Sequence, residues 1–193
     1  MKRKSLNLAK GIIIFPILCA FFISSSQAEE YQEGYLNAKW GMSRAQVIQS
    51  LPNYTFIRAE DFIYFNDVID GEPVQTQFYF THNKLYVVYI WFFRENIDQH
   101  AIPNEFYRFE KLLKTKYGEP STIWRSRIDG EDPVYTIQMR GGTYYDEWLT
   151  PESSILLNLE HNPQTIGEFI LRIIYKSRKL TEMADRELAV KKL

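Results

Sequence analysis

Cysteine is nearly absent from this sequence: the one cysteine, Cys19, lies within the first 28 residues. Those residues begin with basic side chains, continue as an apolar run over 11–23 and end in small residues, which is the order of a secretory signal peptide. The run has 13 residues, fewer than the roughly 20 that a membrane-spanning helix needs. We therefore expect cleavage after Ala28 and an exported protein, periplasmic or secreted, that begins at Glu29 and makes no stable membrane insertion. The alternative is an uncleaved membrane anchor.

The loss of Cys19 with the signal peptide leaves a mature chain without a thiol. Such a chain has no disulfide, no reactive thiol and no thiolate metal ligand. The stability of this exported protein must then come from an ordinary hydrophobic core. Phe, Tyr and Trp make up 16% of the sequence and supply large side chains for that core.

An excess of positive charge is also lacking. Removing 28 residues from 193 leaves 165, enough for one exported domain over 29–193, with 19 Lys and Arg against 24 Asp and Glu. Nucleic-acid binding needs a basic face that neutralises phosphates. We therefore expect no nucleic-acid partner.

Motifs for catalysis and for metal or cofactor binding are missing as well. The three histidines, His82, His100 and His161, lie far apart and match no metal-ligand spacing. There is no Gly-x-Ser-x-Gly nucleophile turn and no glycine-rich phosphate loop. We predict that the protein is not an enzyme and has no catalytic residue, no cofactor and no metal site.

Four carboxylates lie close together in the sequence, namely Asp61, Asp67, Asp70 and Glu72. They could converge into a functional cluster, but solvated hairpin ends explain them more simply.

The stretch from Trp40 to Leu51 predicts a short helix with a clear N-terminal capping signal. Ser43 can cap the first free amides, and Gln46 can reach back to the Ser43 N–H, which is a capping box. Pro52 disfavours a helical conformation at the residue before it and ends the helix. A second helix is predicted over 104–117 from an apolar stripe at helical spacing, and a C-terminal surface helix over 177–193.

Strands are predicted in two sets. The first comprises 62–65, 75–81 and 84–93, and the second comprises 122–128, 134–140, 153–160 and 168–176. Asp-Gly, at Asp70-Gly71 and again at 129–130, is a strong hairpin signal. The order predicts an α+β fold: an antiparallel sheet built from two helix-plus-β-meander units, 36–97 and 98–176, with both helices on one face. Whether the halves are true repeats or share Asp-Gly turns by chance stays open.

A resemblance follows from these motifs. The helix opening Gly41-Met42-Ser43, with Val47 four residues after Ser43, and the three-stranded meander after it are similar to the module of the SmpA/OmlA (BamE) outer-membrane assembly lipoproteins. Trp40 before this opening and the Lys-Tyr-Gly-Glu-Pro run at 116–120 resemble other exported bacterial proteins more closely. The tandem form resembles the fold of β-lactamase-inhibitor proteins. The chain departs from BamE in lacking a lipid-accepting cysteine. The resemblance implies the fold and a non-enzymatic role, and it implies no functional residues.

One stretch, 143–148, is both aromatic and acidic, and we predict an interaction loop whose contact residues are Tyr144, Tyr145 and Trp148. The alternative is that Tyr144 and Trp148 cover the edge of the core. The predicted function is a non-catalytic binding protein of the bacterial envelope, with another envelope or secreted protein as partner. The alternative is a small-molecule or glycan-binding domain that uses the open face of the sheet. An aromatic, apolar face away from the helices would favour docking.

Overall fold

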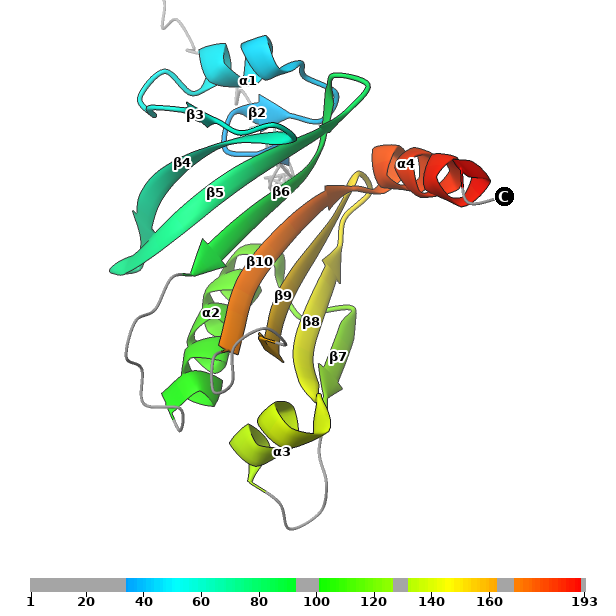
Figure 1. The fold of residues 1–193 in the computed structure, drawn as a ribbon. Helices are drawn as coiled ribbons and strands as arrows, with labels where there is room; N and C mark the ends of the chain where they lie inside the picture. Colours follow the sequence, from blue (N-terminus) through cyan, green and yellow to red (C-terminus); the bar gives the residue numbers. More distant parts are fainter. Residues whose placement is uncertain (1–33, 93–100, 127–131, 163–168, 192–193) are drawn as a thin grey trace, which may run out of the picture. The chain divides into compact units, whose positions relative to one another are not determined.

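The computed structural model describes residues 34–92, 101–126, 132–162 and 169–191 (Figure 1). The backbone divides into two compact units, Met1–Glu30 and Tyr31–Leu193, and every described residue belongs to the second unit. The predicted signal peptide over 1–28 and the turn at 129–130 lie outside the described residues.

Helices and strands follow one another along the described chain in a mixed order. They are β1 (Gly34–Tyr35), β2 (Ala38–Lys39), α1 (Arg44–Ser50), β3 (Ile57–Arg58), β4 (Phe62–Ile69), β5 (Glu72–Thr81), β6 (Lys84–Phe92), α2 (Ile102–Tyr117), β7 (Thr122–Arg125), α3 (Pro133–Arg140), β8 (Thr143–Leu149), β9 (Ser153–His161), β10 (Phe169–Ser177) and α4 (Arg178–Lys191). None of the helices in the described part is long and apolar enough to cross a membrane.

Eight of the strands form one antiparallel sheet in the order β3-β4-β5-β6-β10-β9-β8-β7, and β1 pairs with β2 separately. The predicted α+β class and antiparallel sheet are confirmed. The last strand of the first set, β6, pairs with the last strand of the second set, β10, at the centre of the sheet. Both ends of the sheet are therefore edges, one at β3 and β4 and the other at β7.

The predicted capping box opens α1. The Ser43 N–H donates to Gln46 Oε1 at 2.9 Å, and the Gln46 N–H is directed at Ser43 Oγ. Val47 is fully buried, which fixes the apolar side of this short helix against the sheet. A helix of this length is marginal in water and depends on that packing.

The helix α2 begins two residues earlier than predicted and ends as predicted at Tyr117, with Gly118 at a positive φ of 78° after it. Phe106 and Phe109 are buried, whereas Leu112, part of the predicted stripe, is 44% exposed. Arg108 joins this helix to the β4–β5 turn.

The Arg108 guanidinium accounts for two of the four carboxylates noted in the sequence. It donates to Asp70 Oδ2 at 2.8 Å and to Glu72 Oε1 at 3.0 Å, and it also pairs with Glu105 of its own helix. These carboxylates hold α2 on the hairpin, so they serve the fold and form no acid–base pair.

The prediction of a strand over 134–140 is wrong, because these residues form α3. Asp132 Oδ1 accepts from the Val134 N–H at 2.7 Å, Pro133 occupies the first turn, and Gly141 ends the helix in the left-handed region with φ 63°. An Asp-Pro start and a Gly stop are helix signals. The branched and aromatic residues between these start and stop signals have a high strand propensity, which led to the wrong prediction.

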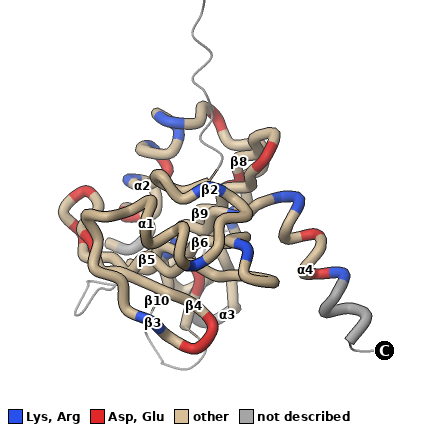
Figure 2. Tube along the Cα trace, turned by 90° about the horizontal axis from the view of Figure 1, so that it is seen from above, with Lys and Arg blue, Asp and Glu red and all other residues tan. Residues whose placement is uncertain are grey.

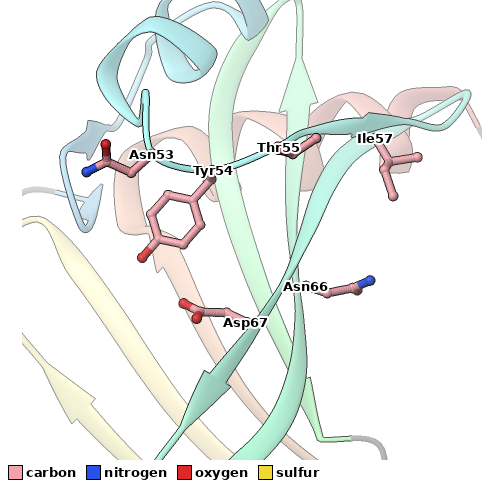
Figure 3. Close-up of a pocket in the computed structure, with 6 residues that line it drawn as sticks. All are labelled: Asn53, Tyr54, Thr55, Ile57, Asn66 and Asp67. Atoms are coloured by element: carbon pink, nitrogen blue, oxygen red, sulfur yellow. The ribbon is translucent and has the colours of Figure 1, made fainter.

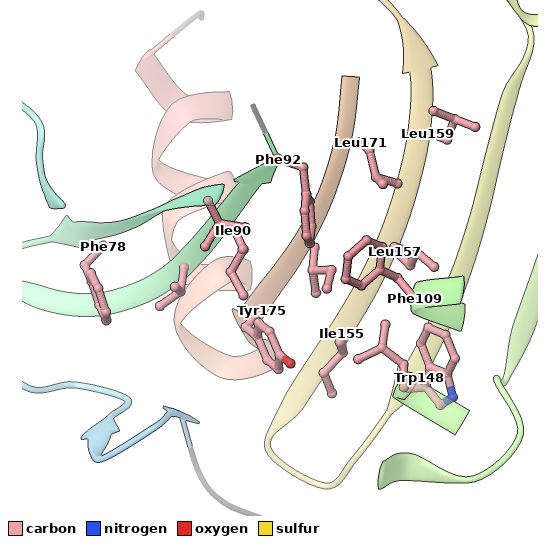
Figure 4. Packing of buried hydrophobic residues seen from close by; sticks show 14 of the residues in the cluster. Phe78, Ile90, Phe92, Phe109, Trp148, Ile155, Leu157, Leu159, Leu171 and Tyr175 are labelled. Carbon is pink, nitrogen blue, oxygen red and sulfur yellow. The ribbon is translucent and has the colours of Figure 1, made fainter. Parts of the chain in front are cut away.

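The core lies on the face of the sheet that α1, α2 and α3 cover (Figure 4). Val47 of α1, Phe109 of α2 and Ile137 of α3 belong to the same buried cluster as the sheet residues. The Phe92 and Phe109 rings lie 4.3 Å apart between centroids, which joins the centre of the sheet to α2. We call the opposite face of the sheet the open face; the strand side chains that do not point into this core lie on it.

Candidate functional site

The alternation of side chains along each strand assigns residues to the two faces of the sheet. In β6, Val88 and Ile90 point into the core, so Tyr89 and Trp91 lie on the open face. Residues of neighbouring strands that stand opposite these two in the register lie on the same face. The helix α4 contacts β6 and β10, and Val87 and Ile174 are buried on this side of the sheet.

Four aromatic rings follow one another across β4, β5 and β6 on the open face. Phe62 stacks on Tyr79 with centroids 5.0 Å apart, Tyr79 meets Tyr89 edge-on at 5.2 Å, and Tyr89 stacks on Trp91 at 5.9 Å. We call Phe62, Tyr79, Tyr89 and Trp91 the aromatic ladder. Each of the four side chains is partly exposed, so the ladder is both supported from within and accessible.

Amide side chains hold the ladder in place. Gln77 Oε1 accepts from the Tyr79 hydroxyl at 2.9 Å and from Trp91 Nε1 at 3.1 Å, and Gln77 Nε2 donates to Gln75 Oε1 at 2.6 Å. Burial raises the pKa of Tyr79 above its ordinary value, and the nearby Tyr89 and Asp61 raise it further. The hydroxyl therefore stays protonated and remains a donor at neutral pH.

Arg172 of β10 extends the ladder toward the second half of the sheet. Its guanidinium lies over the Trp91 ring at 5.2 Å, Nε donates to Asn158 Oδ1 at 3.1 Å, and Nη2 pairs with Glu160 at 2.7 Å. Three partners on two strands fix one orientation of this side chain. An arginine so placed presents a flat, charged surface without a large entropy cost on binding.

A second aromatic pair lies at the far edge of the open face. Trp124 of β7 stacks on Tyr145 of β8 with centroids 6.5 Å apart and planes 18° from parallel. Trp124 is 52% exposed, and Leu149 on the same face is 49% exposed. A tryptophan with half its surface in water is a large apolar group without a partner in the described part of the chain other than Tyr145 and its own neighbours.

The register places the two aromatic groups in one line across the sheet. Trp91 stands opposite Arg172, Arg172 opposite Asn158, Asn158 opposite Tyr145, and Tyr145 opposite Trp124. We call these five residues the transverse row. It crosses four strand-to-strand gaps, so it is about 19 Å long.

The residues predicted as an interaction loop lie on a strand, β8, so the prediction of a loop is wrong. Tyr144 and Trp148 point into the core and are 1% and 2% exposed, which is the alternative that the sequence left open. Trp148 Nε1 donates to the Gly118 carbonyl at 2.8 Å. Of the three residues, only Tyr145 reaches the open face.

Sequence reasoning missed Trp91, Trp124 and Arg172. The signal for Trp91 was present, since the 84–92 strand is apolar on both faces and one of those faces must lie away from the core. Nothing local marks Trp124 or Arg172, because their neighbours on the open face come from strands that are distant in the sequence.

A buried ionic group lies on the core side of the same strands. Arg125 binds Asp146 through two hydrogen bonds, of 2.6 Å and 3.0 Å, and stands 3.4 Å from Glu110. Its guanidinium lies over the Phe106 ring at 4.5 Å. Burial lowers the pKa of Arg125, but the hydrogen bond and charge of Asp146 outweigh it and raise the pKa above its ordinary value. This group is fully paired, so its role is structural.

Among the described residues, no group of three or more His, Cys, Asp and Glu side chains is placed to hold a metal ion. Comparisons of the chain with protein-family models, with curated proteins and with solved structures give no match. The resemblance to the SmpA/OmlA module stays a prediction.

Proposed function

We propose that this chain is a non-catalytic, exported binding protein of the bacterial envelope, and that its open face docks another envelope or secreted protein. The observation that carries the proposal is the transverse row, in which a half-exposed Trp124 and a fixed Arg172 lie in line with Trp91. Trp, Tyr and Arg are the residues that contribute most to protein–protein binding energy.

The rigidity of the face supports this proposal. Gln77 restrains Tyr79 and Trp91, and Asn158 and Glu160 restrain Arg172. Binding through side chains that are already ordered costs less entropy than binding through free ones. A row of about 19 Å is compatible with a standard interface of about 800 Å² per partner.

The charge of the chain also fits a protein partner. Figure 2 shows Lys and Arg interspersed with Asp and Glu along the described trace, including α4. On the open face itself, the Arg172 charge is balanced by Glu160. A balanced face with exposed rings favours a protein over nucleic acid.

We further propose that the chain arose from two helix-plus-meander halves, 36–97 and 98–176. Support comes from the strand order, in which β3-β4-β5-β6 and β7-β8-β9-β10 run inward from opposite edges to meet at β6 and β10. In this arrangement α3 is an insertion in the second half. The open face then combines one aromatic group from each half.

The glycan or small-molecule alternative uses the same residues. The Gln75 amide stands opposite the partly exposed Trp91 ring, and such a combination of a flat apolar group and a hydrogen-bonding group also suits a sugar ring. The exported protein partner is favoured because the row is long and lies on the face of the sheet, across five strands.

The test is a quantitative pull-down from envelope extract with the wild-type protein and a Trp124→Ala/Tyr145→Ala variant. We expect the variant to lose a specific protein partner, and reconstituted binding of that purified partner to weaken at least tenfold, about 1.4 kcal/mol. The matched control is Leu112→Ala, which removes a similarly exposed apolar side chain from α2 on the helix side.

Identical partner lists for the wild type and the double variant would contradict the proposal. Binding to a glycan array that is lost in the same variant, with no protein partner, would replace it by the alternative. Both variants are first checked for wild-type circular dichroism and unfolding, so that a loss of binding reports on the face and not on the fold.

A further inference from the structure

The outer edge of β4 is only partly covered by β3. The two residues of β3 pair with Ile63 and Tyr64, and the Phe62 carbonyl accepts from the Ala59 N–H at 2.9 Å. Even-numbered residues of β4 therefore direct their backbone groups outward. By the same alternation, the outward groups beyond Tyr64 are those of Asn66 and Val68, where the pairing with β3 has already ended.

The segment before β3 does not continue along this edge, because its aromatic side chains pack onto the core. Tyr54 stacks on Phe65 with centroids 4.0 Å apart, and Phe56 meets the same ring edge-on at 5.4 Å. A depression of about 480 Å³ is left where a longer β3 would lie (Figure 3). Its lining residues are Asn53, Tyr54, Thr55, Ile57, Asn66 and Asp67.

Asp67 supplies a negative charge at this depression. Its Oδ1 accepts from the Val68 N–H at 2.8 Å, which covers one outward donor of the edge. Burial raises the pKa of Tyr54 above its ordinary value, and the charge of Asp67 and a hydrogen bond between the Tyr54 and Asp67 side chains raise it further. Within the part of the chain that the structure describes, no Lys or Arg forms an ion pair with Asp67.

We propose that the outer edge of β4 is a second binding site, which takes an extended segment of a partner protein carrying a Lys or Arg side chain. The segment adds as a strand in line with β3 and pairs with the outward backbone of Asn66. The residue opposite Asp67 projects to the same side of the sheet as Asp67, so a cation there meets the carboxylate. Val68, 62% exposed, and Ile57, 44% exposed, supply apolar contacts at the same edge.

This site is independent of the proposed function, because it uses the backbone edge of β4 and none of the transverse row. The probe is an acetylated and amidated pentapeptide, Thr-Val-Lys-Val-Thr, in which the two valines face the outward groups of β4 and the lysine faces Asp67. Titration is followed by the backbone amide NMR signals of the protein. We expect saturable shifts at Asn66 and Val68, with the Asn66 amide protected from hydrogen exchange.

Two control peptides separate the contributions of backbone and charge. N-methylation of both valines removes the pairing donors and should abolish the shifts. Glutamate in place of lysine exchanges attraction for repulsion at Asp67 and should weaken binding about fivefold. In the protein, Asp67→Asn should reduce the difference between the lysine and glutamate peptides to less than about twofold.

The matched variants are Asn66→Pro and Asn66→Ala. Both remove the same side chain, but only proline removes the outward N–H, at an edge position where a strand tolerates it. We expect binding to be lost with proline and kept with alanine, while circular dichroism shows both folded. If Asn66→Pro fails to fold, the N-methylated peptide decides the same question.

Absence of saturable shifts at Asn66 with the lysine peptide at millimolar concentration would overturn the proposal. So would equal binding of the N-methylated peptide. Shifts of the same amides that depend on protein concentration without any peptide would assign the edge to a second copy of this chain instead.

Discussion

Removal of the Asp146 carboxylate should be among the most damaging changes to this fold. Asp146 is fully buried, and its two oxygens hold the Arg125 guanidinium, which is itself only 11% exposed. In Asp146→Ala, Arg125 keeps Glu110 at 3.4 Å but loses both shorter hydrogen bonds. The loss leaves a buried cation with one of its two carboxylates, besides the backbone carbonyls of Trp124 and Tyr145.

The magnitude follows from the burial. Breaking one side of a buried ion pair costs about 3–5 kcal/mol, and the remaining Glu110 places Asp146→Ala near the lower end, about 3 kcal/mol. A domain of this size has about 5–15 kcal/mol of stability, so the change consumes a large share of it. In urea, with a slope of about 2 kcal/mol per molar, the unfolding midpoint should fall by about 1.5 M.

The assay is urea unfolding of the mature protein followed by tryptophan fluorescence, with Asp61→Ala as the control at an exposed carboxylate. The control should stay within about 0.5 kcal/mol of the wild type. A double variant, Arg125→Met/Asp146→Leu, should cost much less than the sum of the single changes, because it removes both charges together. A cost of Asp146→Ala below about 1 kcal/mol, or fully additive single changes, would refute the reasoning.

Two further predictions follow from the same structure. Trp148→Ala should lower the free energy of unfolding by about 3–5 kcal/mol, whereas Trp124→Ala should change it by about 0.5 kcal/mol or less; similar losses in calorimetry would show that the two faces of the sheet are assigned wrongly. Burial raises the pKa of both Tyr35 and Tyr175 well above the ordinary value. Their neutral forms are favoured by folding, so this contribution to stability is complete below about pH 10, the unfolded value, and is lost as the pH rises through and above it. Urea midpoints should therefore fall between pH 9 and 11 in the wild type and fall less in Tyr35→Phe; an equal fall would count against burial as the cause.

The parts of the fold that the sequence predicted are those set by neighbouring residues. The Ser43–Gln46 capping box forms within four residues, and the hairpin turn at Asp70-Gly71 needs only the positive φ values that these two residues adopt. The prediction of a strand over 134–140 was wrong, although the signals that mark the true helix are also local. Asp132, Pro133 and Gly141 start and stop a helix, and these signals outweigh the strand propensity of the residues between them.

The candidate site was decided by tertiary structure. Tyr144 and Tyr145 are the same residue type side by side, and only the pairing of β8 with β9 and its packing on α2 determines which of them is buried. The transverse row depends on the contact of β6 with β10, which joins Trp91 to Arg172 across the sheet. Capping and turn formation need contacts only a few residues apart in the sequence, so the sequence alone was enough to predict the start of α1 and the β4–β5 hairpin. Which face of each strand meets water depends on pairing between segments that are distant in the sequence. Only the tertiary structure decided this.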